Sequence, residues 1–158
     1  FSQAASALLC GPLLVIDYAL EARRYYSAMR PCGTLMAYRQ QKASGELLQD
    51  PGRWDLTAHL CLETLQHQAE QQGWTFLGET RQGQALLALG LAERLHALQG
   101  LPTSQLSAAL NRREALLRLV DPAGLGDFRW LAFELRHKPS VDAEVGELRC
   151  RFLEEPVS

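Results

Sequence analysis

An uninterrupted apolar run near the start of the chain, Leu13–Ile16 (LLVI), is the feature that most constrains the fold. Gly11 and Pro12 precede this run, and Asp17 and Tyr18 end it abruptly with a carboxylate and a phenol. A short run that is apolar on both faces predicts a strand of a parallel sheet that helices cover on both sides. The polar pair after it would then lie at the mouth of an α/β site, where such folds bind ligands.

Strand-like and helix-like segments alternate along the rest of the chain. Phe1–Cys10 reads as the tail of an amphipathic helix, and residues 21–29 as a short helix that Pro31 stops. The later segments are a helix from Leu62 to a stop at Gly73, a strand at 74–78, helices over 82–98 and 104–120, a turn at 124–126 and a strand at 128–135. This order predicts an α/β fold with part of an open, mainly parallel sheet and helices on both faces.

The apolar spacing also predicts which faces of the two later helices point inward. Helical spacing places Leu86, Leu89 and Ala97 on one face of the helix over 82–98. In the helix over 104–120 the corresponding inward positions are Leu106, Leu110, Leu117 and Val120.

A long polar connection is the main candidate for function. Residues 31–55 are rich in glycine, proline and polar side chains, and a connection of this length is usually functional or disordered. We expect one domain over 1–138 with a long loop over 19–58, followed by a tail over 139–158 in which the alternation at Leu148–Phe152 allows a short edge strand. Because the chain opens inside a helix, we interpret it as a fragment or the downstream half of a split gene.

Composition limits the classes of partner and compartment. The 158 residues are 47% hydrophobic and carry a formal charge of −2, so we expect neither a nucleic-acid nor a membrane partner. The longest uncharged stretch, Ala4–Ile16, is too short to span a bilayer and lacks the features of a signal peptide. The four cysteines contain no C-x-x-C pair, which favours free thiols in a reducing compartment over disulfides.

Several common motifs can be set aside. His59, Cys61 and His67 match no zinc-ligand spacing, so we expect no metal site. The turn at 124–126 has the form G-x-G but precedes a strand, so it does not predict a phosphate-binding loop. No G-x-S-x-G motif is present to predict a serine nucleophile.

Asp17 and Tyr18 are the first candidate site residues. A carboxylate directly after a buried strand is costly to desolvate unless it binds something. The alternative is that Asp17 caps the following helix. Right-handed crossovers would place Asp17 and Tyr18 along the same sheet edge as residues 79–82, which include Gln82.

A second group of candidates lies in the long connection. Tyr38 and Arg39, near Gly33 and Thr34, could stack on and hold a polar substrate, or they could belong to a packed loop with an exposed arginine. Asp55, Thr57 and His59 alternate, so in an extended segment their side chains would face one way. That triplet contains an acid/base pair with a hydroxyl beside it. Alternatively, these three residues tie the loop to the start of the next helix.

These residues, in this order, resemble the MidA-type S-adenosylmethionine-dependent methyltransferases, whose mitochondrial members assist assembly of respiratory complex I. The resemblance runs over roughly residues 11–131 and covers the carboxyl-terminal half of that family. The matching positions are Leu14–Tyr18, Gly33-Thr34-Leu35, Tyr38, Pro51-Gly52, Asp55, Thr57, His59, Thr80, Gln82, Leu86, Leu89-Gly90-Leu91, Pro122, Gly124-Leu125-Gly126 and Phe128.

The resemblance implies a fold, a cofactor and an activity. The strands at 13–16, 74–78 and 128–135 would be strands 5, 6 and 7 of a Rossmann-like seven-stranded sheet, with the seventh antiparallel. S-adenosylmethionine would be the cofactor, bound mostly by an upstream half of the same protein. The implied reaction is methyl transfer to an arginine nitrogen of a protein substrate. The implied catalytic residues are Asp17, Tyr18, Tyr38, Asp55 and His59, and the implied substrate-binding residues are Gly33, Thr34, Arg39, Thr57 and Gln82.

Two further functions remain open at this point. The chain departs from the family pattern at Ala19, Gln41, Cys61, Leu62 and Ala85, which keeps a non-catalytic assembly module on the same scaffold as the alternative. A small-molecule methyltransferase would differ only in its acceptor. The resemblance implies a cytoplasmic protein of bacterial type, with mitochondrial relatives in eukaryotes.

Overall fold

A computed structural model describes residues 1–8, 10–40, 42–135 and 150–155 of the chain. The chain divides into two compact units. The first unit comprises Phe1–Ile16 and Ala69–Ser158, and the second comprises Asp17–Gln68.

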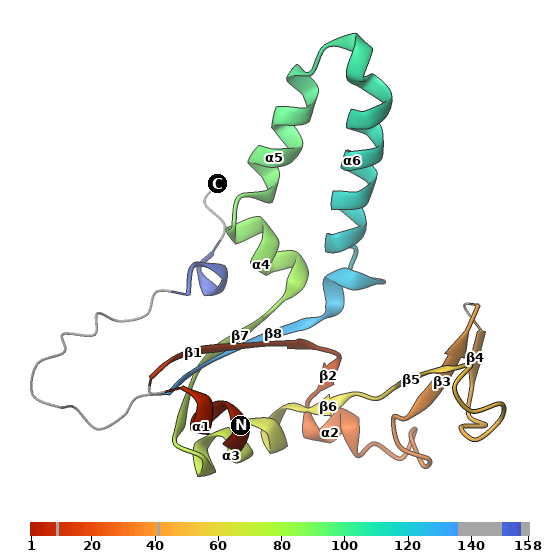
Figure 1. Cartoon of the computed structure of the whole chain (residues 1–158), viewed down its shortest axis with the longest axis vertical. Coiled ribbons are helices and arrows are strands. Elements are labelled where there is room, and N and C mark those ends of the chain that lie inside the picture. Colours follow the sequence, from red (N-terminus) through yellow and green to blue (C-terminus); the bar gives the residue numbers. More distant parts are fainter. Residues whose placement is uncertain (9, 41, 136–149, 156–158) are drawn as a thin grey trace, which may run out of the picture. The chain divides into compact units, whose positions relative to one another are not determined.

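A three-stranded sheet forms the centre of the first unit. Its strands are β1 (Gly11–Asp17), β7 (Trp74–Arg81) and β8 (Arg129–Leu135), in the order β1-β8-β7 (Figure 1). Strand β8 runs antiparallel to β7, in a register from Trp74 opposite Leu135 to Arg81 opposite Arg129. These strands confirm the three that the apolar runs predict, and the antiparallel β8 is what the resemblance implies for the last of them.

The core of this unit lies on the central strand β8. Leu131 and Phe133 are fully buried there, and Trp74 at the start of β7 is buried as well. Phe1, just before helix α1 (Ser2–Ala7), packs its ring edge-on against Phe133, with 5.0 Å between the ring centroids. An apolar middle strand therefore collects aromatic side chains from distant parts of the chain, and their burial stabilises the sheet.

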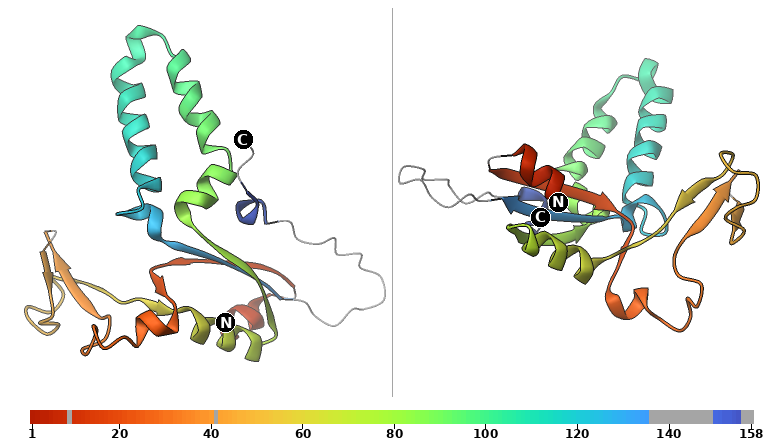
Figure 2. Two further views of the ribbon diagram at one scale, coloured as in Figure 1. Left: turned by 180° about the vertical axis from the view of Figure 1, so that it is seen from behind. Right: turned by 60° about the horizontal axis from the view of Figure 1, so that its bottom comes forward.

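The helices after β7 differ from the expected ones. The predicted helix over 82–98 is two helices, α4 (Gln82–Ala88) and α5 (Leu91–Ala97), because Gly90 adopts a left-handed conformation with φ of 90°. Two 3₁₀ turns, Leu98–Gly100 and Thr103–Gln105, lead into helix α6 (Leu106–Val120). Both views of the ribbon show α5 and α6 side by side, extending away from the sheet of this unit (Figures 1 and 2).

Three of the four inward positions expected on α6 are wrong, whereas Val120 is only partly exposed. Leu106, Leu110 and Leu117 are 57%, 55% and 40% exposed, whereas Ala109 is buried. The small Ala109 lets α6 approach its neighbours closely, so the packed face is turned away from the leucines. The expected turn after α6 is confirmed as a 3₁₀ turn over Leu125–Asp127.

The second unit contains short paired strands where the sequence predicts a loop. A three-stranded antiparallel sheet has the order β4-β3-β5, with β3 (Met36–Arg39), β4 (Lys42–Ser44) and β5 (Asp55–Thr57). The expectation of a loop over 19–58 is therefore wrong in detail. Polar strands of three or four residues lack the apolar alternation by which strands are found in a sequence.

Three further elements frame this small sheet. Strand β2 (Ala19–Leu20) pairs in parallel with β6 (Leu60–Cys61), and β6 leads directly into helix α3 (Leu62–Gln71). Helix α2 (Ala22–Tyr25) is shorter than the expected segment at 21–29. Gly73, with φ of 80°, follows the end of α3 as expected.

The carboxyl-terminal tail lies largely outside the described residues. The expected edge strand over Leu148–Phe152 begins outside them, and the described Arg151–Leu153 forms a 3₁₀ turn. The four cysteines form no disulfide with one another. Among the described residues, no helix has both the length and the apolar character needed to cross a membrane.

Candidate active site

Main-chain pairing brings two candidate segments together in the second unit. The parallel pair β2–β6 places Ala19 opposite Leu60, and the Leu60 N–H donates a hydrogen bond of 2.7 Å to the carbonyl oxygen of Tyr18. Leu20 and Cys61, the next pair along, are buried. Backbone hydrogen bonds thus hold the Asp17-Tyr18 pair in register with the segment that ends at His59.

Tyr18 and His59 face each other at this junction. Their ring centroids are 5.9 Å apart, with the planes tilted by 51°. Oδ1 of Asp17 accepts a hydrogen bond of 2.7 Å from the N–H of Tyr18. Within the described part of the chain, Oδ2 of Asp17 has no hydrogen-bond partner, and Oδ1 keeps a second lone pair, so both carboxylate oxygens can still accept from a ligand.

The alternative role of Asp17 as a helix cap is wrong. The first free N–H of α2, on Ala22, donates to Oε2 of Glu63 at 2.7 Å. Glu63 lies in the first turn of α3, and the same oxygen lies 3.7 Å from Sγ of Cys61. Because Glu63 is 41 residues from Ala22 in sequence, no local pattern could have identified it as the cap.

Gly33 and Thr34 support His59 from the other side. Gly33 has φ of 80°, and its N–H donates to the carbonyl of Arg30 at 3.0 Å, which closes a tight turn. Oγ1 of Thr34 then accepts a hydrogen bond of 3.1 Å from the N–H of His59. Thr34 is buried, so the structure gives it a positioning role, and direct contact of Gly33 or Thr34 with substrate stays a prediction.

The small sheet carries the remaining polar candidates of this unit. Strands β3 and β5 place Tyr38 opposite Asp55 and Met36 opposite Thr57. Side chains directly opposite each other in an antiparallel pair share a face, and so do residues two apart, so all four lie on one face. Arg39 alternates with Tyr38 onto the other face, where its Nη1 forms an ion pair of 3.1 Å with Asp50.

The Tyr38–Asp55 pair and the Asp17–His59 group form two separate clusters. Asp55 lies four residues before His59, a span of at most about 13 Å for extended backbone. No hydrogen bond or ion pair among the described residues joins the two clusters. Binding of one substrate guanidinium by the carboxylates of both Asp17 and Asp55 therefore stays a prediction.

Burial and charge together disfavour the protonated form of His59. Partial burial is the largest cause that lowers the pKa of its imidazole below the ordinary 6.5, and the guanidinium of Arg30 is the next. Asp17 opposes this effect, and Arg24 adds to it. Nδ1 of His59 is buried and has no hydrogen-bond partner within the described ranges. The lowered pKa favours the neutral imidazole near neutral pH, which is the form that can accept a proton.

Gln82 belongs to the first unit, where its amide connects three elements. Nε2 donates to the carbonyls of Leu119 and Leu125, both at 3.0 Å, and Oε1 accepts from Nε1 of Trp130 at 3.2 Å. Both amide hydrogens are thus committed within the fold. The prediction that Gln82 binds substrate stays untested, and the structure assigns it a structural role.

The β7–α4 junction does not fit a cofactor cradle. It contains Gly83, but a Cβ added there would lie 3.2 Å from the carbonyl oxygen of Val120, so this glycine permits close packing within the fold. We therefore assign no cofactor contact to this junction. Among the described residues there is also no group of three His, Cys, Asp or Glu side chains that could hold a metal ion.

Sequence reasoning missed two arginines close to this site. Arg24 and Arg30 influence His59 electrostatically, and Nη1 of Arg30 donates to the carbonyl oxygen of Arg24 at 2.7 Å. Arg30 has one indication in the sequence: it lies three residues before Gly33, which is followed by the predicted site residue Thr34.

Comparisons with known proteins support the fold class and indicate the family. A family profile described as "Putative S-adenosyl-L-methionine-dependent methyltransferase" matches residues 1–80. A crystal structure of a "COG1565 superfamily member and likely methyl transferase" from Burkholderia thailandensis, bound to S-adenosyl-homocysteine, is 26% identical. It aligns with a TM-score of 0.76 over 99% of this chain and 38% of its own length.

A second solved structure gives the same result. It is the native crystal structure of an uncharacterized protein of that superfamily from Burkholderia thailandensis, 26% identical, with a TM-score of 0.75 over 99% of this chain and 39% of its own. The chain thus spans about two fifths of the length of the solved structures that it matches. No curated protein matches the sequence.

Proposed function

The chain belongs to the family of S-adenosylmethionine-dependent methyltransferases whose profile it matches, and from this premise we propose that it is the substrate-side part of a protein methyltransferase. The proposal assigns the cofactor-binding strands and loop to residues upstream of Phe1, since the chain covers 38% of a relative's length. The acceptor that we propose is an arginine nitrogen of a respiratory-complex-type protein, by resemblance to the MidA-type enzymes. The same resemblance supports a cytoplasmic compartment in bacteria.

One observation supports this proposal: two hydrogen bonds donated by main-chain N–H groups bring a carboxylate, a phenol and a neutral imidazole together. The Leu60–Tyr18 bond fixes Asp17 and Tyr18, and the His59–Thr34 bond fixes the imidazole. Methyl transfer depends chiefly on how the acceptor is oriented and on where its proton goes. These three groups supply both functions.

Each side chain has a distinct role in the proposed reaction. The carboxylate of Asp17 accepts two N–H groups of the acceptor guanidinium and fixes its plane. Tyr18 packs on that plane, and Tyr38 and Asp55 hold the neighbouring part of the acceptor. His59 takes the proton that the guanidinium nitrogen releases as it forms its bond to the methyl carbon. S-adenosylmethionine, bound by the upstream part, would supply that methyl group on a sulfonium centre.

A specific observation favours a second candidate, a non-catalytic assembly module. The exposed leucines Leu106, Leu110 and Leu117 recur at i, i+4 and i+11 on α6, so they share one face of the helix. Methyl transfer does not require such a surface, whereas docking of a partner protein does.

Calorimetry with S-adenosylmethionine separates the two candidates. The enzyme proposal expects no measurable binding by residues 1–158 alone. It expects binding once the chain is extended by the residues encoded upstream of Phe1. Absence of binding by both forms would remove the enzyme proposal and leave the module.

A further inference from the structure

Three arginines of the second unit have no carboxylate partner among the residues that the structure describes. In the same unit Arg39 and Arg53 both pair with Asp50, at 3.1 and 3.7 Å. Arg23, Arg24 and Arg30, in and after helix α2, form no ion pair. Exposed cations need no partner, but Arg30 is half-buried and its guanidinium is held in place, which calls for an explanation.

The guanidinium of Arg30 is oriented by its own chain segment. Nη1 donates to the carbonyl oxygen of Arg24 at 2.7 Å, and that carbonyl lies in α2. The carbonyl of Arg30 accepts from the N–H of Gly33 at 3.0 Å, which fixes the backbone as well. A guanidinium carries five N–H donors, so several remain for a bidentate bond to a carboxylate.

This arginine also belongs to the candidate active site. Thr34 lies four residues after Arg30, and its Oγ1 accepts a hydrogen bond from the N–H of His59. The tight turn at Gly33 therefore links Arg30 to the residue that supports His59. Among the neighbouring charges Arg30 acts most strongly on His59, Arg24 acts in the same direction and Asp17 in the opposite one. Asp17 directly precedes Tyr18, whose ring centroid lies 5.9 Å from that of His59, so the carboxylate and the turn that begins at Arg30 both adjoin the His59 segment.

A site with one carboxylate and two guanidinium groups is complementary to a ligand that carries both a positive and a negative group. Asp17 alone would favour any cation, whereas the two arginines repel a lone guanidinium ligand and attract an acid. We propose that Arg30, assisted by Arg24, forms a carboxylate-binding subsite beside Asp17, and that the acceptor is a peptide segment with an acidic residue adjacent to the arginine that is methylated. This substrate class rests on the proposed function.

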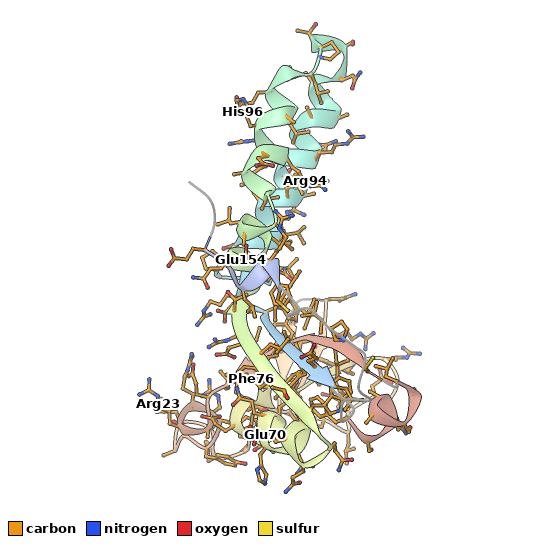
Figure 3. The ribbon with its side chains drawn as sticks, turned by 90° about the vertical axis from the view of Figure 1, so that its left-hand side faces the viewer. Arg23, Glu70, Phe76, Arg94, His96 and Glu154 are labelled. Atoms are coloured by element: carbon orange, nitrogen blue, oxygen red, sulfur yellow. The ribbon has the colours of Figure 1, made fainter. Side chains whose placement is uncertain are left out.

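Peptide binding tests the subsite without requiring methyl transfer. The probes are the capped peptides Gly-Arg-Glu-Gly and Gly-Arg-Gln-Gly, titrated into residues 1–158 and followed by the NMR signals of the His59 ring. We expect the acidic peptide to bind about tenfold more tightly, and Arg30→Gln to abolish that preference. Arg23→Gln is the matched control, because Arg23 is not among the charges that act on His59 and its side chain extends away from the ribbon (Figure 3).

Two further measurements complete the test. Arg30→Glu should reverse the preference toward Gly-Arg-Lys-Gly, a gain that an unfolded variant could not produce. The carboxylate that binds Arg30 could instead be that of the amino-acid end of S-adenosylmethionine. The affinity for S-adenosylmethionine is therefore measured in the chain extended upstream of Phe1, with and without Arg30→Gln. Loss of cofactor affinity in Arg30→Gln, or equal binding of the two peptides by the unmodified chain, overturns the subsite. Failure of the extended chain to bind cofactor while the peptide preference persists would overturn only the proposed function.

Discussion

The main-chain N–H of His59 donates a hydrogen bond of 3.1 Å to Oγ1 of Thr34, 25 residues earlier in the chain. Thr34 is a buried residue and the bond is part-buried, so water competes less with it than at the surface. It joins the turn at Gly33 to the segment that follows β5. The position of the imidazole thus depends on a residue that itself does no chemistry.

Thr34→Val should remove this bond with little change of volume. The buried N–H of His59 would lose its partner, and the unfolding free energy should fall by about 1 kcal/mol in urea denaturation. Thr34→Ser keeps the acceptor oxygen and should retain most of that stability. Thr57→Val is the control, because no hydrogen bond of the Thr57 hydroxyl is found in the described residues. Equal losses for Thr34→Val and Thr57→Val would contradict the assignment.

The pKa of His59 should lie below 6.5 in an NMR titration of the ring protons, since burial and Arg30 disfavour the imidazolium. Arg30→Gln should raise this pKa, and Asp17→Asn should lower it further. A histidine whose pKa is lowered by folding binds more protons when unfolded. Its contribution to stability is therefore complete above pH 6.5 and is lost as the pH falls through the folded pKa. His59→Gln should flatten this part of the stability profile, and an unchanged profile would refute the assignment.

Asp17→Asn should reduce methyl transfer by the extended chain about a hundredfold, because the neutral amide cannot orient a guanidinium through two charged bonds. Thermal unfolding should be almost unchanged, since Asp17 bonds only to its neighbour's N–H among the described residues. Glu46→Gln, an exposed carboxylate change in the same unit, is the control. Turnover that survives in Asp17→Asn would remove this residue from the mechanism.

Gln82→Ala should destabilise the first unit by about 2 kcal/mol, because the carbonyls of Leu119 and Leu125 and the indole N–H of Trp130 lose a partner together. Gln84→Ala, which loses a single bond to Thr80, should cost less. The measurement is chemical denaturation followed by tryptophan fluorescence. Unchanged stability combined with a raised KM for the acceptor would instead support a role of Gln82 in substrate binding.

Gly126→Ala should destabilise the chain by more than about 2 kcal/mol, because a methyl group has no space there. Its carbon would lie 2.5 Å from the carbonyl carbon of Val120 and 2.7 Å from the carbonyl oxygen of Asp121, and both belong to the backbone. Gly100→Ala meets nothing within 4 Å and should be nearly neutral. Comparable melting temperatures for the two variants would show that the turn after α6 adapts easily.

The sequence predicted the elements whose signals are local. Leu13–Ile16 and the segment up to Leu135 are apolar runs that form strands, although only the second of these strands is buried, and Gly73 stops a helix by its left-handed conformation. The sequence also places Asp17 at the end of an apolar strand and His59 just before a helix with a regular apolar spacing. Both are positions where α/β folds present polar side chains.

The remaining features depend on contacts between distant residues. The register that sets Tyr38 opposite Asp55 joins short polar strands, and no apolar pattern records it. The packing of α6 through Ala109 instead of Leu110 depends on how closely neighbouring backbones approach. Glu63 caps α2 from 41 residues away, and Arg30 gains its position from a bond to the carbonyl of Arg24.

Strand β1 ends its sheet, and Leu14 and Ile16 are each 44% exposed there. In the part of the chain described, its outer main-chain groups face no further strand. An exposed apolar edge strand is prone to aggregation, since strands from other molecules can pair with it. Purified samples of this polypeptide should therefore precipitate increasingly with concentration, and a charged residue such as lysine at position 14 should improve solubility.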